Sequence, residues 1–401
     1  MHYGLRELEL TSLPERLVLA PGESGLGVVL RDRGRLVGFK MIARTDFGPD
    51  GALDPCRLVD ASVREASAIE RLRSEMGPPS DPAPTLTVAI CSKDRQDWLS
   101  RLLDSLAPLR VKEDAFEVLV VDNASSDDRL HAVCAARDWV RYVYEPLVGL
   151  NFARNRAIRE ARGEVIAFLD DDVVVDENWL SAMRRAWAEN PDAGCITGLV
   201  LPMVLDTEAQ WLFEMRGGFR RDFCPLRFGS ERHKERLHPC GAGRFGAGAN
   251  MSVRRVLVTR LGGFDEALDT GRPLPGGGDL DIFYRILRSG ATLVYEPQAA
   301  VYHDHRKEMR VLARQYYTWG LGFMAFVVKS MRTDGSMRTR FRQLIVWWFF
   351  YQFKRLAKRA AGREPTPVRM IFGEIFGGII GLSGEYDRSR RRIAAIRTGA
   401  A

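Results

Sequence analysis

Three consecutive carboxylates follow an apolar segment near the middle of the chain. Residues 164–169 (EVIAFL) have the composition of a buried strand, and Asp170, Asp171 and Asp172 come directly after it. Alternation along an extended chain end places Asp170 and Asp172 on one side and Asp171 on the other. Because like charges repel, a divalent cation would offset this cluster, and Mg²⁺ or Mn²⁺ held by carboxylates and substrate phosphates is expected. An acidic loop that only caps the next helix is the alternative.

A second polar cluster ends another apolar segment, VLVVDNASSDD (118–128). Asp122 and Asn123, with the serines and acids after them, can hydrogen-bond a base and a ribose, although an Asx-type turn explains them equally well. Arg154 lies in a helix-like segment, residues 151–163, that leads to the acidic strand. From there its guanidinium can contact a diphosphate, and an exposed helix arginine is the alternative.

The segments that carry these residues alternate between strand-like and helix-like patterns. Apolar strands are predicted at residues 86–91, 116–123, 139–145 and 164–169, with helices between them. Such strands predict an α/β fold with a doubly wound, mostly parallel sheet. Ligands of these sheets bind outside the carboxyl ends of the strands, which is where the polar clusters lie.

The flanking segments give the chain three parts. Residues 77–84 (GPPSDPAP) hold four prolines in eight positions, which prevents helix and central strand and marks a linker. Residues 1–76 alternate apolar and polar positions and predict a small β-rich module, ending in a helix over 62–76 with a capping box from Ser62 to Glu65. Residues 85–305 form the expected α/β domain, and residues 306–401 are predicted to be helical and basic.

Composition and charge exclude several classes of protein. The chain is 46% apolar and 28% charged, as in folded proteins. Its six cysteines are scattered, which argues against a disulfide scaffold or a cysteine-based zinc site. Residues 301–401 hold 20 Lys and Arg against 7 Asp and Glu, so the remainder is mildly acidic and nucleic-acid binding is not expected. No secretory signal is visible, and the apolar runs are shorter than the ~20 residues that span a bilayer, so a cytoplasmic location is expected.

Five segments together resemble the motifs of family 2 glycosyltransferases, which have the GT-A fold. They are LTVAICSKDR (86–95), VLVVDNASSDD (118–128), GLNFARNRAIREARGEVIAFLDDD (149–172), GAGANMSVRR (246–255) and GGGDLDIFYRILRSG (276–290). The resemblance implies an inverting enzyme that uses Mn²⁺ or Mg²⁺ and a nucleotide-diphospho-sugar, with UDP expected. The acceptor would be a hydroxyl of a glycan, lipid-linked or other cell-envelope molecule, as in polysaccharide biosynthesis. A catalytically impaired nucleotide-sugar-binding or scaffolding homologue is the alternative.

The same resemblance implies roles for individual residues. Asp122 is expected to meet the base, Arg154 the base or diphosphate, and Asp170 the ribose and metal, while Asp172, of the D-x-D motif, ligates the metal. The residues expected to contact the donor are Ser92, Asp94, Asp122, Asn123, Arg154, Asp170, Asp171, Gly248 and Asn250. For Gly248 and Asn250, which end a glycine-rich loop, a structural turn is an equal interpretation.

The segment 276–290 carries the expected base. Asp279 and Asp281 lie in the first turn of a predicted helix, where carboxylates also favour the helix dipole. Inverting transfer needs a base for the acceptor hydroxyl proton, and the family uses the Asp of a Glu-Asp pair. Here Gly278 replaces the Glu, so Asp279 is the predicted base ahead of Asp281, and the acceptor contacts usually made by the Glu are left open.

Two histidines follow in AVYHDHR (300–306). His303 and His305 are two residues apart, hence on one face of a predicted strand end, and imidazole is a common metal ligand. The resemblance places a histidine near the metal and favours His303. Surface histidines beside Asp304 are the alternative.

The C-terminal region has a signal of its own. LIVWWFFY (344–351) is flanked by Arg340 and Arg342 and by a basic run with Lys354, Arg355, Lys358 and Arg359, and a second apolar segment covers residues 370–382. Tryptophans beside cations are typical of a lipid headgroup interface, so we expect peripheral association with an anionic membrane surface. Helices that only pack on the catalytic domain are the alternative.

Overall fold

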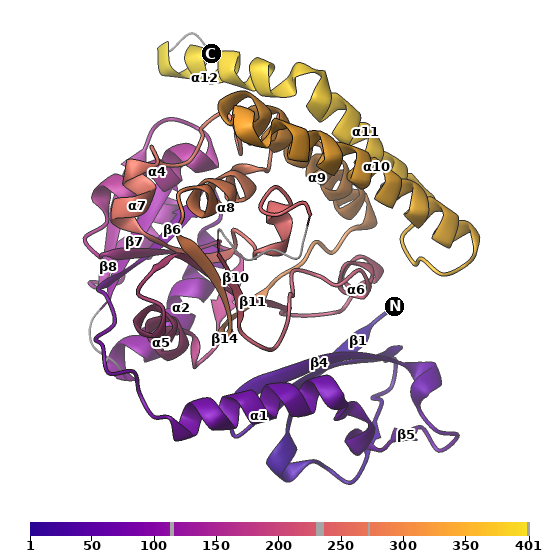
Figure 1. The fold of residues 1–401 in the computed structure, drawn as a ribbon. Coiled ribbons are helices and arrows are strands. Elements are labelled where there is room, and N and C mark those ends of the chain that lie inside the picture. The colour runs from indigo at the N-terminus through magenta and orange to yellow at the C-terminus, as the bar shows by residue number, and fades with distance from the viewer. Residues whose placement is uncertain (113–115, 230–235, 272, 399–401) are drawn as a thin grey trace.

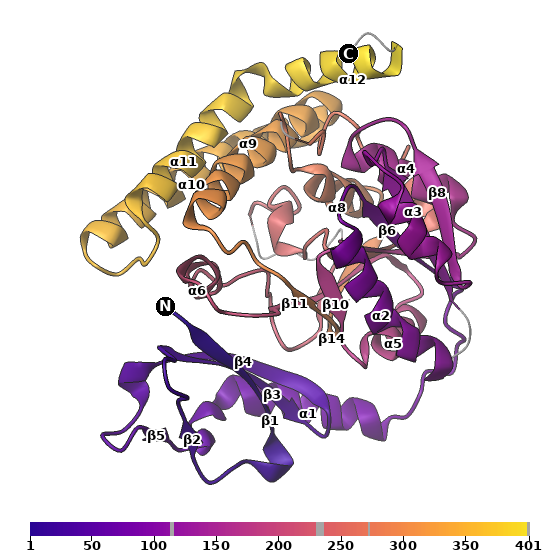
Figure 2. The same ribbon diagram turned by 180° about the vertical axis from the view of Figure 1, so that it is seen from behind.

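The structure is a computed structural model of residues 1–401, and it describes all of them except 113–115, 230–235, 272 and 399–401. Figure 1 shows a small N-terminal module below, a central sheet flanked by helices, and a group of long C-terminal helices across the top. Figure 2 shows the same three layers from behind.

The N-terminal module is a three-stranded sheet with one helix. Its strands are β1 (Tyr3–Glu9), β3 (Gly25–Asp32) and β4 (Arg35–Ala43), in the order β1-β3-β4, and β2 (Leu17–Val18) pairs with β5 (Ala52–Leu53) beside them. Helix α1 (Ala61–Glu75) is capped by Asp60, whose carboxylate accepts from the Val63 amide and the Ser62 hydroxyl. The predicted capping by Ser62 is therefore wrong, because the carboxylate before it binds the helix amide instead.

This module is fixed to the rest of the chain along one face of its sheet. One apolar cluster of the module lies within it, and a second joins Tyr3, Val29 and Phe39 to residues of the central sheet such as Leu199. Arg31 donates to the buried Asp176 and to the Tyr302 hydroxyl. Strand β3 is consequently buried on both faces, and the module has a fixed position relative to the central sheet.

The central sheet has nine strands in the described part of the chain. Eight follow the order β10-β14-β11-β13-β9-β6-β7-β8, and β12 pairs with β14. Their bounds are β6 Leu86–Ser92, β7 Glu117–Asn123, β8 Val140–Glu145, β9 Val165–Leu169, β10 Val173–Val175, β11 Ala193–Pro202, β12 Leu226–Phe228, β13 Asn250–Arg254 and β14 Thr292–His303. The pairs of β6 with β7 and β9, of β7 with β8, and of β11 with β14 are parallel. Strand β13 is antiparallel to both of its neighbours, so the sheet is mixed with a parallel-rich core.

Helices cover both faces of this sheet. One face packs on α2 (Gln96–Lys112), α3 (Arg129–Ala135) and α5 (Trp179–Glu189). The other packs on α4 (Leu150–Glu160), α7 (Arg255–Arg260) and α8 (Gly278–Arg288). A short helix, α6 (Glu208–Met215), lies to one side of the sheet, to the right of β11 in Figure 1. The predicted α/β class, with a β-rich N-terminal module and a helical C-terminal region, is confirmed.

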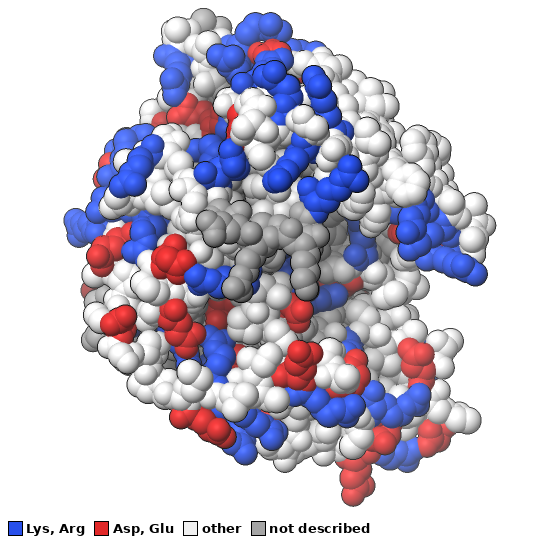
Figure 3. Space-filling view, viewed as in Figure 1, with Lys and Arg blue, Asp and Glu red and all other residues white. Residues whose placement is uncertain are grey.

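Four helices form the C-terminal region: α9 (Met309–Thr333), α10 (Arg338–Ala360), α11 (Val368–Ile380) and α12 (Tyr386–Thr398). Helices α9 and α11 cross in close contact. Gly320 and Gly377 permit this approach, since a side chain at either position would overlap the main chain of the other helix. This packing explains Gly377 and Gly381 of the apolar segment 370–382, both of which lie against the main chain of α9. Across the described residues, no helix is long and apolar enough to cross a membrane. On the face in Figure 3, Lys and Arg gather over the upper part, where the C-terminal helices lie.

The ion pair that joins the module to the sheet should contribute strongly to stability. We expect Arg31→Met to lower the free energy of unfolding by about 3 kcal/mol, because it leaves the buried Asp176 carboxylate without its cation. Arg16→Met removes an exposed pair with Asp50 and should cost less than about 1 kcal/mol. Urea denaturation of both variants measures the difference. Equal losses would show that the Arg31 pair does not fix the module.

Candidate active site

The ends of β6 and β9 hold Asp171 between them. The Ser92 hydroxyl donates to Asp171 Oδ2 over 2.6 Å, and Arg95 Nη1 donates to Asp171 Oδ1 over 2.5 Å. Burial raises the pKa of Asp171 to about 7, with Arg95 opposing the shift and the charge of Asp172 adding to it. Asp171 therefore turns toward β6, and Arg95 bridges it to Asp172. The expected placement of Asp170 and Asp172 on one side of the chain, with Asp171 on the other, stays a prediction.

Asp172 lies against a histidine from the neighbouring part of the sheet. His303 Nε2 is 3.3 Å from Asp172 Oδ1, and Arg95 Nη2 donates to Asp172 Oδ2 over 2.9 Å. Although burial opposes them, these contacts hold the pKa of Asp172 below its usual range. Asp170 borders a cavity and has a side chain 39% exposed. The enclosure around it and the charge of Asp172 raise the pKa of Asp170.

These residues offer part of a metal site. In the described part of the chain, no group of three or more His, Cys, Asp and Glu residues is arranged to hold a metal ion. Asp172 and His303 are nevertheless in contact, and Asp170 repels Asp172 across the cavity edge. Carboxylate and imidazole suit Mn²⁺, and Mg²⁺ typically keeps few protein ligands when it binds substrate phosphates. The residues therefore fit a cation that shares its ligands with a diphosphate.

His305 lies behind His303 and faces the protein interior. The Nδ1 atoms of the two rings are 2.9 Å apart, and His305 Nε2 is 2.8 Å from Glu214 Oε1. Arg220 is ion-paired with the same Glu214 carboxylate. Both nitrogens of His305 are thus occupied, so His303 is the histidine whose Nε2 faces the carboxylates.

The turn after β7 and the neighbouring strand β8 border a separate polar pocket. Asp122 accepts from the Ser125 amide over 2.9 Å and from the Tyr142 hydroxyl over 2.8 Å, so it does close a turn. A cavity of about 570 Å³ beside it is lined by the turn and by Tyr142 and Tyr144. Asp94 accepts from the amide and hydroxyl of Ser126, which ties the two strand ends together.

Asn123 positions the next helix. Its amide donates to the Leu147 carbonyl over 2.7 Å, and its oxygen accepts from the Gly149 amide over 2.9 Å. Gly149 has a φ of 146°, a conformation that favours glycine, and it precedes α4. Asn123 thereby fixes the start of the helix that carries Arg154.

A larger cavity, of about 760 Å³, is bordered by Asp170, His303, Arg154 and Asp279. Asp279 Oδ2 accepts from the Gly248 amide over 3.2 Å, and its Oδ1 accepts from its own helix, at Leu280. A Cβ on Gly248 would lie 3.1 Å from both Arg154 Nη2 and Asp279 Cβ. The glycine therefore permits the loop of Gly248 to approach both side chains.

Asp269 is a carboxylate of this cavity that the sequence analysis missed. It lies 3.4 Å from Arg154 Nη1 and accepts from the Gly278 amide over 2.9 Å, at the start of α8. Burial raises the pKa of Asp269 to about 6, with Arg154 opposing and Asp279 adding to the shift. Its backbone φ is 53°, an unusual value that cannot be read from a sequence, so no sequence pattern pointed to this residue.

Two predicted site residues, Asp281 and Asn250, are enclosed by buried structural contacts instead of bordering the cavity. The Asp281 carboxylate is fully buried and ion-paired with Arg285 and Lys329. Asn250 is also fully buried; it donates to the carbonyls of Leu199 and Ala299 and accepts from Trp179 Nε1. For Asn250 the structural interpretation fits these contacts, and Asp281 joins α8 to α9.

Further parts of the cavity wall come from residues that the sequence analysis did not single out. Arg306 Nη1 lies 3.7 Å from Asp172 Oδ2, at the end of the strand that carries His303. Arg216 and Arg221 reach the cavity from the segment after α6, and Trp319 and Glu374 reach it from α9 and α11. Residues this distant in sequence are brought together only by the fold.

Comparisons with known proteins identify the class of this domain. The model of glycosyl transferase family 2 matches residues 87–250, which contain β6 to β9 and the three carboxylates. Residues 87–250 thus match the glycosyltransferase family 2 model, which confirms the resemblance seen in the motifs.

The relatives with known names include proteins of bacteria and of an archaeon. A pre-mycofactocin glycosyltransferase of Mycobacterium tuberculosis is 28% identical over 240 residues, covering 58% of this chain and 46% of that protein. The succinoglycan biosynthesis protein ExoM of Rhizobium meliloti is 27% identical, covering 59% and 72%. A glucosyl-dolichyl phosphate glucuronosyltransferase of Haloferax volcanii is 24% identical, covering 75% and 95%. The chain thus spans about half the length of the mycobacterial relative.

A mannosyltransferase of Pyrobaculum calidifontis, in complex with GDP-Man and Mn²⁺, gives a TM-score of 0.48 at 18% identity, covering 84% of this chain and 95% of that chain.

The contrast between Gly248 and Asn250 can be measured directly. We expect Asn250→Ala to lower the free energy of unfolding by about 3 kcal/mol, because it leaves two buried carbonyls and an indole N–H without partners. Gly248→Ala should cost less than about 1 kcal/mol, since the new Cβ meets side-chain atoms that border a cavity. Urea denaturation tests both, and a stable Asn250→Ala variant would contradict the structural assignment.

Proposed function

We propose that the protein is an inverting glycosyltransferase that moves a sugar from a nucleotide-diphospho-sugar to an acceptor hydroxyl. One observation carries the proposal: Asp170 and His303 border the same cavity as Asp279. A site for the departing diphosphate and a carboxylate base therefore face one space. The family match and the named glycosyltransferase relatives support the same activity.

The donor would lie along the carboxyl ends of β6, β7 and β9. We assign the base and ribose to the pocket of Asp122, where Tyr142 and Tyr144 supply aromatic faces. UDP remains the expected nucleotide. Arg154 is buried between Asp170 and Asp269 and lies within reach of the diphosphate, where its charge would favour the departing anion.

A divalent cation, Mn²⁺ or Mg²⁺, would supply charge that stabilises the leaving diphosphate. Asp172 and His303 would hold it, with Asp170 at the cavity edge. His305 would orient His303 through the Nδ1 contact, and Glu214 would fix the tautomer of His305. Arg95 balances the charge of Asp171 and Asp172 at the other side.

Asp279 is the proposed base. Asp279 borders the cavity, and among the described residues its Oδ2 accepts one hydrogen bond, from the Gly248 amide, so a lone pair remains for the acceptor hydroxyl. Asp281 has no such access, because its carboxylate is enclosed by two cations. A catalytically impaired homologue remains the second candidate, since Gly278 replaces the usual Glu and Arg95 already pairs with Asp172. Donor-dependent release of nucleoside diphosphate separates the two.

Asp279→Asn tests the base. Donor affinity should stay near that of the wild type while kcat falls by roughly 10² to 10⁴, because the amide cannot accept the proton. Asp281→Asn is the control: it should lower stability while the remaining folded protein keeps its turnover. The measurements are donor binding, turnover and anomeric product analysis. Near-normal turnover of Asp279→Asn, or a product of retained configuration, would refute the assignment.

Metal binding tests the proposed roles of Asp172 and His303. Asp172→Ala should abolish metal-dependent turnover and weaken Mn²⁺ binding in the presence of UDP by more than about tenfold, since it removes an anionic ligand from a site with few. His303→Ala should weaken binding less. Isothermal titration with Mn²⁺ measures both. A larger effect of His305→Ala than of His303→Ala would show that the wrong histidine has been chosen.

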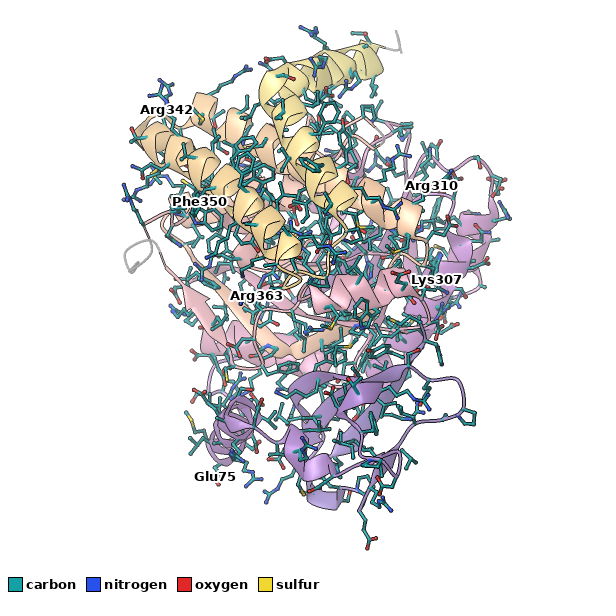
Figure 4. The ribbon with its side chains drawn as sticks, turned by 90° about the vertical axis from the view of Figure 1, so that its right-hand side faces the viewer. Glu75, Lys307, Arg310, Arg342, Phe350 and Arg363 are labelled. Atoms are coloured by element: carbon teal, nitrogen blue, oxygen red, sulfur yellow. The ribbon has the colours of Figure 1, made fainter. Side chains whose placement is uncertain are left out.

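We further propose peripheral association with an anionic membrane surface through α10 and α11, with the cytoplasmic location still a prediction. Large apolar side chains are exposed along both helices: Val346, Trp347, Phe350, Tyr351, Phe353, Val368, Phe372, Phe376 and Ile379. Figure 4 shows Phe350 and Arg342 on α10, with Arg363 just beyond its end. Arg355 does not belong to this surface, because it is buried and ion-paired with Glu374; counting it among the surface cations was wrong.

The exposed cations of α10 test this association. Replacing Lys354, Lys358 and Arg359 with Glu should reduce binding to anionic vesicles, because each cation near such a surface contributes about 1 kcal/mol. Co-sedimentation with phosphatidylglycerol vesicles measures the loss, and neutral vesicles are the control. Vesicle binding that neither the substitutions nor added salt reduces would contradict the electrostatic part of the proposal.

A further inference from the structure

A second space, of about 1,230 Å³, continues the candidate active-site cavity outward. Its walls are the segment of Leu237 to Phe245 and the face of α10 that carries Val346, Trp347 and Phe350. The two spaces share a border made of six residues: Arg216, Arg221, Gly243, Phe323, Trp348 and Glu374. We call the outer space the α10 groove.

The α10 groove contains three buried hydrogen-bond donors without a partner in the described structure. They are Nη1 of Arg216, Nε of Arg221 and Nε2 of Gln352. Arg216 uses its other terminal nitrogen for the Glu374 carboxylate, and Gln352 uses its oxygen for Arg355. Buried donors are normally satisfied, so three of them lining one space indicate an acceptor that arrives with a ligand.

The charge around these donors selects the kind of acceptor. Arg221 makes no ion pair in the described part of the chain; its terminal nitrogens donate to main-chain carbonyls. The α10 groove is lined by five arginines (Arg216, Arg221, Arg236, Arg244 and Arg342) against one carboxylate, Glu374. Arginine N–H groups in this number match phosphate oxygens, which only accept hydrogen bonds.

The outer part of the α10 groove has the opposite character. Val346, Trp347, Phe350 and Tyr351 are apolar or aromatic, and all four are exposed on α10. The molecule that fits both parts carries an oxyanion at one end and a hydrocarbon at the other.

We propose that the α10 groove binds the phosphate ester of a long-chain alcohol, with its phosphate at Arg216, Arg221 and Gln352 and its chain along the exposed face of α10. This assignment rests on the proposed function, because it makes the bound lipid the carrier of the acceptor. A sugar attached beyond the phosphate would enter the cavity that Asp279 borders. The chain would leave along Trp347 and Phe350, on the surface proposed to meet the membrane (Figure 4).

Binding of dodecyl phosphate to the full chain, below its micelle concentration, tests the assignment. The fluorescence of Trp347 and Trp348, which line the groove, should report saturable binding. Inorganic phosphate and dodecanol should each bind at least tenfold more weakly, because each lacks one half of the ligand. Arg221→Gln should weaken binding at least tenfold. Arg216→Gln, judged with near-UV circular dichroism, provides a second variant where Arg221→Gln does not fold.

A pair of phenylalanines on one helix gives a matched control. Phe350 is 66% exposed and lines the groove, whereas Phe353 is 59% exposed and does not. Phe350→Ser should weaken dodecyl phosphate binding at least fivefold, and Phe353→Ser should leave it unchanged. Equal losses would indicate adsorption to an apolar surface. Self-association that Phe350→Ser abolishes would indicate a second copy as the occupant, and equally tight binding of inorganic phosphate would indicate a free anion site. Each of these results overturns the proposal.

Donor assays separate this proposal from the proposed function. If the protein turns over a nucleotide sugar but does not bind dodecyl phosphate, the groove assignment fails and the glycosyltransferase activity stands. If it binds dodecyl phosphate with the expected variant pattern but neither binds nor turns over any of a panel of nucleotide sugars, the proposed function fails and a lipid-phosphate site remains.

Discussion

Three carboxylates that follow one buried strand must be kept apart, and the site depends on how the fold separates them. Asp171 turns to β6, where Ser92 and Arg95 bind it. Asp172 turns to β14, where His303 meets it. Asp170 stays at the cavity edge, 4.0 Å from Arg154. Each carboxylate therefore requires a different neighbouring element, so β6, β14 and α4 have to lie around the end of β9 for the cluster to exist.

Much of this arrangement could be predicted, and the failures have physical reasons. Strands β6, β7 and β9 are apolar almost throughout, which identifies a parallel sheet, and the polar residues that follow them mark its ligand-binding edge. Nothing in the sequence of β13 signals that it runs antiparallel between β9 and β11. Asn250 could not be assigned for the same reason, because its partners Leu199, Ala299 and Trp179 come from three other elements. Asp269, Arg216 and Arg221 matched no motif, and only their position in the fold marks them.

The N-terminal module is connected to the site through a chain of contacts. The Arg220 guanidinium lies 4.5 Å from the ring centroid of Phe39, on β4, and is ion-paired with Glu214. Glu214 faces His305, which in turn contacts His303. The orientation of His303 thus rests on a buried polar row whose outer end packs against the module. This gives the module a structural relation to the site although its own strands contribute no residue to the cavity.

The C-terminal helices shape the other side of the site through one buried carboxylate. The glycine crossing of α9 and α11 brings Glu374 inward, where it pairs with Arg216 and Arg355. Arg355 also lies 3.7 Å from Glu364. Arg221 adds a third guanidinium, which is partly buried and makes no ion pair in the described part of the chain, although the charge of Asp279 also acts on it. A partly buried cation without an ion-pair partner favours an anionic ligand. The position of this charge, between an open polar cavity and an apolar groove, is what makes an anionic amphiphile the ligand that best fits it.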